Sequence, residues 1–168
     1  MKKKILGITL VTVLVAMLIA PVIATSPNKK PVTAVITGIM GADPVVEIRV
    51  TKGGIEHLEY FKFWGTMELN LEGVLLPIPV EWVDVCVGTY NSKNNKGVYK
   101  FDEVWTLPGG TFEGTAHLKL EGSLFSYTHM TAHIILHGTG AYEGQILSLT
   151  SDDDTSGFPS YAGYWLKP

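Results

Sequence analysis

The feature that most constrains this chain is a two-residue alternation of apolar and polar side chains, which recurs along most of the sequence after residue 31. Successive side chains of a β-strand point to opposite faces, so this alternation is typical of strands with one buried and one exposed face. Gly, Pro and Asn interrupt it at short intervals, and no segment has a helical period over a convincing length. We expect strands over nine segments: 32–39, 45–51, 55–72, 80–90, 97–107, 111–121, 125–137, 142–150 and 161–167.

The segments between these strands are too short for the crossovers that parallel strands need. The chain has 168 residues, of which 46% are hydrophobic and 17% charged, which suggests one domain and excludes a disordered chain. Antiparallel strands joined by tight hairpins form either a closed barrel or a sandwich. We therefore predict one all-β domain over residues 32–168.

The N-terminus has the pattern of a targeting segment. Three lysines precede an apolar run, Ile5–Ala24, and Val22 and Ala24 fit the −3 and −1 positions of signal-peptidase cleavage. Residues 1–24 therefore read as a signal peptide, or as an uncleaved anchor helix, because twenty apolar residues can also span a bilayer. Both interpretations predict a secreted or extracytoplasmic protein. Residues 25–31 form a polar linker.

Charge and cysteine content exclude several classes of function. Without residues 1–24, the chain has ten basic and sixteen acidic residues, which gives a net charge of −6. This balance disfavours nucleic acid as a partner and leaves 5–24 as the only expected membrane contact. The single cysteine, Cys86, excludes a disulfide framework, and its flanking valines indicate a buried thiol that behaves as a small apolar side chain.

One hairpin can be read in register. Pro108-Gly109-Gly110-Thr111 predicts a two-residue turn centred on Gly109-Gly110. Closing this turn places apolar faces of the two strands side by side. The expected opposite pairs are Leu107 with Phe112, Trp105 with Gly114, and Glu103 with Ala116. A short loop after the second strand would then bring His117 near His129 and Glu113 near His133.

Glu103 is the least expected residue of this hairpin, because it shares a strand face with aromatic side chains. Burial disfavours an ionised carboxylate, so its pKa should be raised, as suits a general acid or base. We therefore take Glu103 as the candidate catalytic residue. The alternative is a structural role near a barrel mouth or beside a cation such as Arg49. The candidate ligand-binding residues are its aromatic neighbours: Tyr99, Phe101, Trp105 and Phe112.

Two patterns suggest metal binding, and neither is complete. His129, His133 and His137 share one strand face, but four residues span about 13 Å of strand, so the three cannot bind one metal ion. Residues 152–157 match the start of a calcium loop, yet the twelfth position is Gly163 rather than Glu. We predict no metal site, with a hydrated outer face and an exposed acidic turn instead.

Two segments carry a resemblance to a known family. Trp105–Gly114 reads WTLPGGTFEG, and His137–Gln145 reads HGTGAYEGQ. This pairing of a Gly-Gly hairpin with a GTG turn resembles the allene oxide cyclase and dirigent type of β-barrel, over about residues 97–150. The resemblance implies an eight-stranded antiparallel barrel with an apolar lumen. It also implies no cofactor, because active members guide cyclisation or radical coupling without one.

Three functions follow from these observations. The first is an exported barrel that binds a small hydrophobic molecule in its lumen. The second is a cofactor-independent enzyme of the cyclase or dirigent kind that uses Glu103, and the third is a structural cell-surface module with a packed lumen. An open lumen would separate the first two from the third. The sequence leaves both a monomer and a homo-oligomer open.

Overall fold

A computed structural model describes residues 28–43, 47–74, 77–154 and 159–167. The expected signal or anchor segment, 1–24, lies outside these residues. No helix among the described residues is long and apolar enough to cross a membrane. The strands are β1 (Asn28–Ala42), β2 (Glu47–Val50), β3 (Ile55–Leu71), β4 (Ile78–Asn91), β5 (Lys96–Leu107), β6 (Gly110–Ser123), β7 (Ser126–Gly138), β8 (Ile146–Asp153) and β9 (Ser160–Lys167), with a 3₁₀ turn, η1 (Gly140–Tyr142), after β7.

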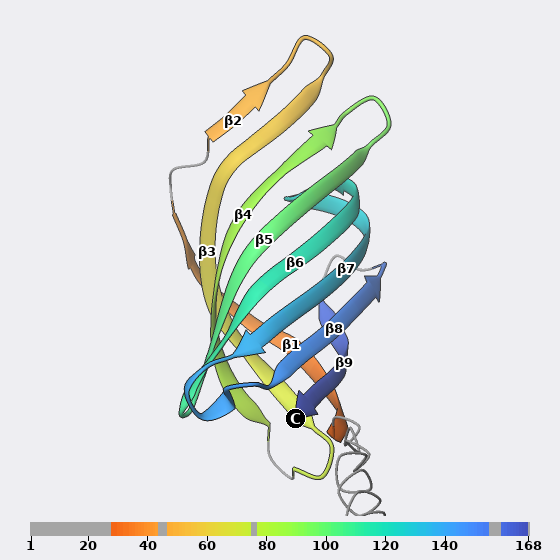
Figure 1. The fold of residues 1–168 in the computed structure, drawn as a ribbon. Coiled ribbons are helices and arrows are strands. Elements are labelled where there is room, and N and C mark those ends of the chain that lie inside the picture. Colours follow the sequence, from red (N-terminus) through yellow and green to blue (C-terminus); the bar gives the residue numbers. More distant parts are fainter. Residues whose placement is uncertain (1–27, 44–46, 75–76, 155–158, 168) are drawn as a thin grey trace, which may run out of the picture.

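The strands form one antiparallel sheet that closes on itself (Figure 1). Neighbours in sequence are neighbours in the sheet from β3 to β9, and β1 closes the ring by pairing with both β9 and β3. Eight strands make the barrel, while β2 pairs with β3 beside it. The prediction of an all-β, eight-stranded closed barrel is confirmed, and the sandwich is excluded.

Alternation sorts the side chains between the interior and the solvent. In β5 every second residue from Gly97 to Leu107 is buried, and every residue between them is exposed. β6 and β7 follow the same pattern over most of their length. The interior therefore receives the apolar face of each strand, as the sequence predicts.

The β5–β6 hairpin keeps the predicted faces but not the predicted register. Leu107 pairs with Gly110, so the turn is Pro108-Gly109 rather than Gly109-Gly110. Proline supplies a fixed negative φ, and Gly109 takes the positive φ of 96° that the turn requires. The register moves by two residues, which places Glu103 opposite Gly114 and Phe101 opposite Ala116.

The predicted β6–β7 pairing is also wrong. Ser123 pairs with Ser126, so the loop is Leu124-Phe125 and lies farther along the chain than expected. His117 lies opposite His133 rather than near His129, and Glu113 lies opposite His137 rather than near His133. A register shift between Glu121 and Gly122 marks a bulge beside this loop. Because a bulge adds one residue to a strand, it changes the face on which the following side chains lie. Uninterrupted alternation would place Tyr127 on the outer face with His129, but Tyr127 lines the cavity in the barrel interior instead.

The two ends of the barrel differ in their loops and packing. At one end, the β5–β6 turn hydrogen-bonds to the β7–β8 connection through the Ala141 N–H and the Gly109 carbonyl. There Phe112, Tyr142 and Trp165 pack together, with ring centroids 5.1–5.6 Å apart. We call this the closed end. The β4–β5 and β6–β7 loops meet at the opposite end, where the Gly122 N–H donates to the Asn95 carbonyl.

Candidate functional site

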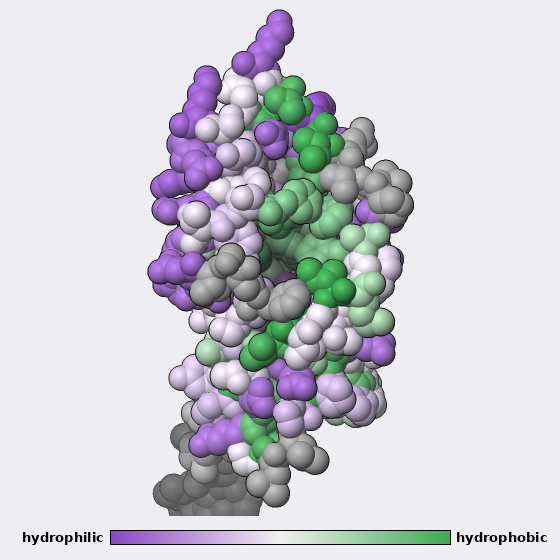
Figure 2. Space-filling view, turned by 180° about the vertical axis from the view of Figure 1, so that it is seen from behind, coloured by the Kyte–Doolittle hydropathy of each residue, from purple (hydrophilic) through white to green (hydrophobic). Residues whose placement is uncertain are grey.

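The half of the barrel away from the closed end contains a cavity of about 450 Å³. Its walls are mainly apolar and aromatic, and Figure 2 shows a hollow with apolar walls on the side of the molecule that faces away in Figure 1. Ile39 and Phe125 line it and are 57% and 62% exposed, so they mark its mouth. The lining residues are Ile36, Ile39, Ala42, Phe61, Phe63, Trp82, Asp84, Phe101, Glu103, Leu118, Leu120, Leu124, Phe125, Tyr127, Met130, Pro159 and Tyr161.

Pairing of the strands explains why the cavity opens to one side. β1 pairs with β9 only as far as Val35 and Ser160, whereas it continues along β3 to Ala42. After Val35, β1 therefore pairs with β3 alone among the described residues. Ile36, Ile39 and Ala42 come from this part of β1 and line the cavity.

Two acidic side chains lie on the cavity wall. Asp84 on β4 and Glu103 on β5 are directly opposite each other in the sheet, and both line the cavity. Directly opposite residues of antiparallel strands have Cβ atoms about 4.5–5.5 Å apart, so the two carboxyl groups are neighbours. We call Asp84 and Glu103 the acid pair. Glu103 is 6% exposed, which confirms the prediction that it is buried on the aromatic face.

Burial dominates the electrostatics of the acid pair. Loss of hydration raises the pKa of Asp84 from 3.8 to about 8. Burial also raises the pKa of Glu103 well above its ordinary range, and the neighbouring charge of Asp84 raises it further. A hydrogen bond from the Trp105 side chain acts in the opposite direction and is the smaller effect. Asp84 is therefore protonated at neutral pH, and its surroundings disfavour the ionised form of Glu103.

Within the described part of the chain, no basic side chain lines the cavity beside the acid pair. Arg49 was considered from the sequence as a partner of Glu103. It forms an ion pair with Glu59 instead, with 2.9 Å between Nη2 and Oε1. Among the described residues, the Oδ1 atom of Asp84 is shielded from solvent and has no hydrogen-bond partner. An unpaired buried acceptor costs about 1–3 kcal/mol, so this arrangement is unusual for a purely structural position.

The remaining titratable groups near the acid pair are also acids. Tyr161 of β9 is 8% exposed, and its pKa is raised well above 10.0 by burial and then by the charges of Glu103 and Asp84. Cys86 follows Asp84 on the inner face of β4. Burial and the Asp84 charge raise the pKa of its thiol to about 12. A thiol with this pKa is not a nucleophile at neutral pH, which supports the predicted core role.

The structure separates the aromatic residues that the sequence grouped with Glu103. Phe101 lines the cavity, whereas Trp105 is 1% exposed and lies outside the lining. Phe112 belongs to the closed end. Tyr99 is buried, and its hydroxyl oxygen accepts a hydrogen bond of 3.0 Å from the Leu124 N–H. Of the proposed ligand-binding set, Phe101 alone adjoins the cavity.

Asp84 is the site residue that the sequence analysis missed. It lies two residues from Trp82 and two from Cys86, both of which are buried. The same argument that identified Glu103 applies to it, because each acid interrupts an apolar strand face at two-residue spacing. The signal was weaker, since the valines between these residues mask the alternation.

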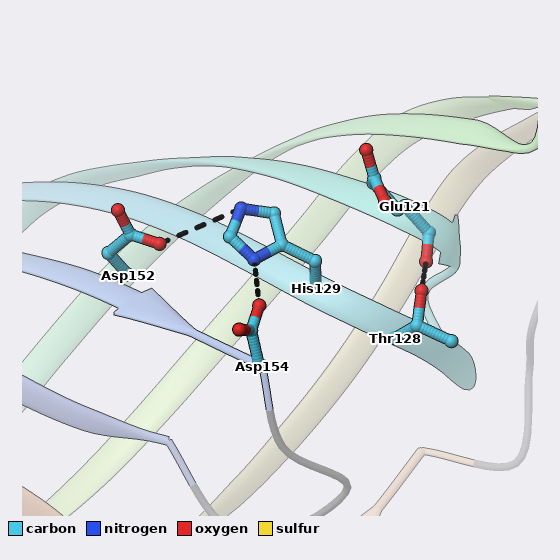
Figure 3. A network of polar contacts seen from close by, with 5 residues as sticks. All are labelled: Glu121, Thr128, His129, Asp152 and Asp154. Carbon is cyan, nitrogen blue, oxygen red and sulfur yellow. Dashed lines mark hydrogen bonds and ion pairs between the residues drawn. The ribbon is translucent and has the colours of Figure 1, made fainter.

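His129, His133 and His137 lie on the outer face of β7, and the side chains of Asp152 and Asp154 are exposed beside His129. Figure 3 shows His129 of β7 between Asp152 and Asp154, with its Nδ1 2.6 Å from an Asp154 oxygen and its Nε2 3.6 Å from an Asp152 oxygen. The hydrogen bond to Asp154 raises the pKa of His129 above 6.5. Among the described residues no group of three or more His, Cys, Asp or Glu side chains is placed to hold a metal ion. Residues 155–157 of the expected calcium loop lie outside the described residues.

Comparison with protein families, with curated proteins and with solved structures gave no significant match. The cavity and the acid pair are therefore interpreted from their own chemistry.

Proposed function

We propose that this protein is an exported β-barrel that binds a small, largely hydrophobic molecule in its lumen. The observation that carries the proposal is the cavity of about 450 Å³ within the open half of the barrel. Ligand sites are commonly 300–1,000 Å³, concave and mainly apolar, with a few converging polar groups. Eight-stranded barrels are just wide enough for one small ligand.

The distribution of packing supports binding over a purely structural role. A structural module gains stability by filling its interior, since empty apolar space loses dispersion contacts. Here the closed end is filled by interlocking aromatic rings, whereas the other half leaves phenylalanine rings facing open space. The exposed Phe125 and Ile39 at the mouth add apolar surface where a hydrophobic molecule would enter.

A pair of tryptophan variants tests the proposal. Leu118 lines the cavity, and the next residue of β6, Lys119, is exposed on the outside. N-phenyl-1-naphthylamine, a neutral apolar fluorophore, is titrated against each variant and the native protein. Leu118→Trp should fill the cavity and weaken binding at least tenfold, whereas Lys119→Trp should bind as the native protein does. Absence of probe binding to the native protein, or equal binding by both variants, would refute the proposal.

A second function, cofactor-independent acid catalysis on the bound molecule, is favoured by one observation. The acid pair lies on the cavity wall, and burial raises the pKa of Asp84 to about 8 and that of Glu103 well above its ordinary range; a carboxyl group that keeps its proton at neutral pH can act as a general acid. This is the chemistry that the resemblance to allene oxide cyclases and dirigent proteins would lead one to propose. A ligand that is converted by the native protein but recovered unchanged after incubation with Glu103→Gln would support it. Recovery of unchanged ligand from both proteins would refute it.

A further inference from the structure

We propose that the lumen selects a hydrophobic molecule with a cationic group, an amphiphilic amine, and holds that group against Asp84 and Glu103. The inference rests on the proposed function, because it names the class of ligand that the same cavity takes. It is carried by the position of the acid pair, by the charges around it and by the rings beside it.

The first step concerns charge. Among the described residues that line the cavity, none is Lys, Arg or His, and two are acids. The nearest lysine along β5, Lys100, points outward and binds Asp102 at 2.8 Å. The other titratable groups that influence the acid pair or Tyr161 are Cys86 of β4, Tyr127 of β7 and Asp153 of β8, and none of them can supply a positive charge.

The second step concerns hydrogen bonding. Asp84 Oδ1 lies inside the barrel wall without a partner among the described residues, and Glu103 is almost completely buried beside it. Carboxylate oxygens accept hydrogen bonds, and an ammonium group supplies three donors with its charge. A charged donor therefore satisfies the acid pair better than a neutral hydroxyl does, because charge-assisted hydrogen bonds are about twice as strong.

The third step concerns the walls beside the acid pair. Trp82 precedes Asp84 by two residues on the same face of β4. Phe101 likewise precedes Glu103 by two residues on the same face of β5. Phe63 contacts both rings edge to face, with centroid separations of 5.4 Å from Trp82 and 5.8 Å from Phe101. Aromatic faces attract a cation within about 6 Å of the ring centroid, and tryptophan is the strongest of them. A carboxylate pair between such rings is suited to an ammonium group.

The remainder of the cavity fits the tail of such a molecule. Leu118, Leu120 and Met130 line the wall on β6 and β7, and Phe125 lies at the mouth. An elongated apolar chain can extend from the acid pair toward the mouth along these side chains. A carboxylate head group has no hydrogen-bond donor for Asp84 Oδ1 and would disfavour ionisation of either acid, so we expect a fatty acid to bind more weakly than the amine.

Binding of a cation should release protons. With a pKa of about 8, Asp84 is protonated near neutral pH in the empty cavity, and burial also disfavours the ionised form of Glu103. A bound ammonium favours the ionised carboxylates and lowers their pKa values. Affinity for an amine that stays charged should therefore rise as the pH rises from about 6 toward about 8, with proton release on binding.

The test compares three molecules with the same tail: decylamine, decanol and decanoate. Each displaces N-phenyl-1-naphthylamine from the native protein, from Asp84→Asn, from Glu103→Gln and from Glu113→Gln, a control on the exposed face of β6. In the native protein and the control, decylamine should bind at least tenfold more tightly than decanoate. Either acid-pair variant should lose most of this preference and keep its affinity for decanol.

Titration calorimetry in buffers of different ionisation enthalpy supplies a second readout. Decylamine should release protons from the native protein at pH 7, and fewer from Asp84→Asn. If decanoate binds as tightly as decylamine, or decylamine binding releases no protons, the inference is wrong while the proposed binding function stands. If neither the fluorophore nor any of the three molecules binds the native protein, the proposed function itself fails.

Discussion

Asp84 and Glu103 show how far a single side chain can be interpreted from sequence. Alternation on β5 predicted that Glu103 is buried, and the structure confirms it. The partner of Glu103 could not be predicted in the same way, because it comes from β4, on the side away from the β5–β6 hairpin. This opposite pair depends on the register of the β4–β5 hairpin, and its loop, residues 92–95, has no turn signal as specific as Pro108-Gly109-Gly110.

At the residue scale, we expect the free energy of unfolding to depend on pH because the acid pair is buried. Between the pKa near 3.8 of the unfolded chain and about 8 in the folded protein, Asp84 ionises only on unfolding. The unfolded state then binds fewer protons, so the free energy of unfolding falls as the pH rises through this range. Asp84→Asn removes this pH dependence. The difference in free energy of unfolding between the variant and the native protein should therefore shift by about 2–5 kcal/mol in favour of the variant from pH 4 to pH 8, since one pKa unit corresponds to about 1.4 kcal/mol.

Urea unfolding at several pH values measures this difference. Asp102→Asn is the matched control, because Asp102 is a neighbour of Glu103 on β5 whose side chain is 66% exposed. The control should follow the native protein across the pH range. Parallel curves for the native protein and Asp84→Asn would show that Asp84 is ionised in the folded state.

At the scale of the element, hairpins account for most differences between prediction and structure. Nine strands were predicted and nine are observed, because alternation and turn residues are local signals. Two of them differ in position: β1 begins at Asn28, inside the segment predicted as a linker, and β8 begins at Ile146 rather than at residue 142, where η1 lies. The registers of β5–β6 and β6–β7 were wrong by small shifts. A shift of two residues preserves the inward face, so the predicted interior remained correct while the opposite pairs changed. The bulge near Tyr127 left no comparable mark in the sequence.

The β5–β6 turn yields the prediction at this scale. Gly109 has a φ of 96°, a conformation that residues with a side chain rarely adopt. Gly109→Ala should therefore lower the free energy of unfolding by about 1–2 kcal/mol. Gly53→Ala is the control, because Gly53 is exposed and an added Cβ would meet nothing nearer than 3.8 Å.

Thermal or urea unfolding of the two alanine variants gives the answer. Equal stability of Gly109→Ala and Gly53→Ala would mean that Gly109 is not the positive-φ position of this turn.

At the scale of the whole molecule, one half of the barrel interior is filled by side chains and the other half contains the cavity. The closed end is filled by Phe112, Tyr142 and Trp165, and the Trp165 indole N–H donates a 2.7 Å hydrogen bond to Gln145. The other half holds the cavity and the acid pair. The sequence predicted an apolar interior, but it could not show which aromatic residues fill space and which leave it open. That distinction depends on where the strands stop pairing, as β1 does with β9 after Val35.

The most direct test of the account is to locate a bound hydrophobic molecule by nuclear Overhauser effects to methyl groups. Leu118, Leu120 and Met130 line the cavity, whereas Val98 and Ile135 are 55% and 39% exposed on the outer face of neighbouring strands. With N-phenyl-1-naphthylamine bound, the account predicts effects between its ring protons and the methyl groups of the first three residues, and none to the last two. Effects confined to Val98 and Ile135, or an absence of effects to the cavity methyl groups at saturation, would contradict it.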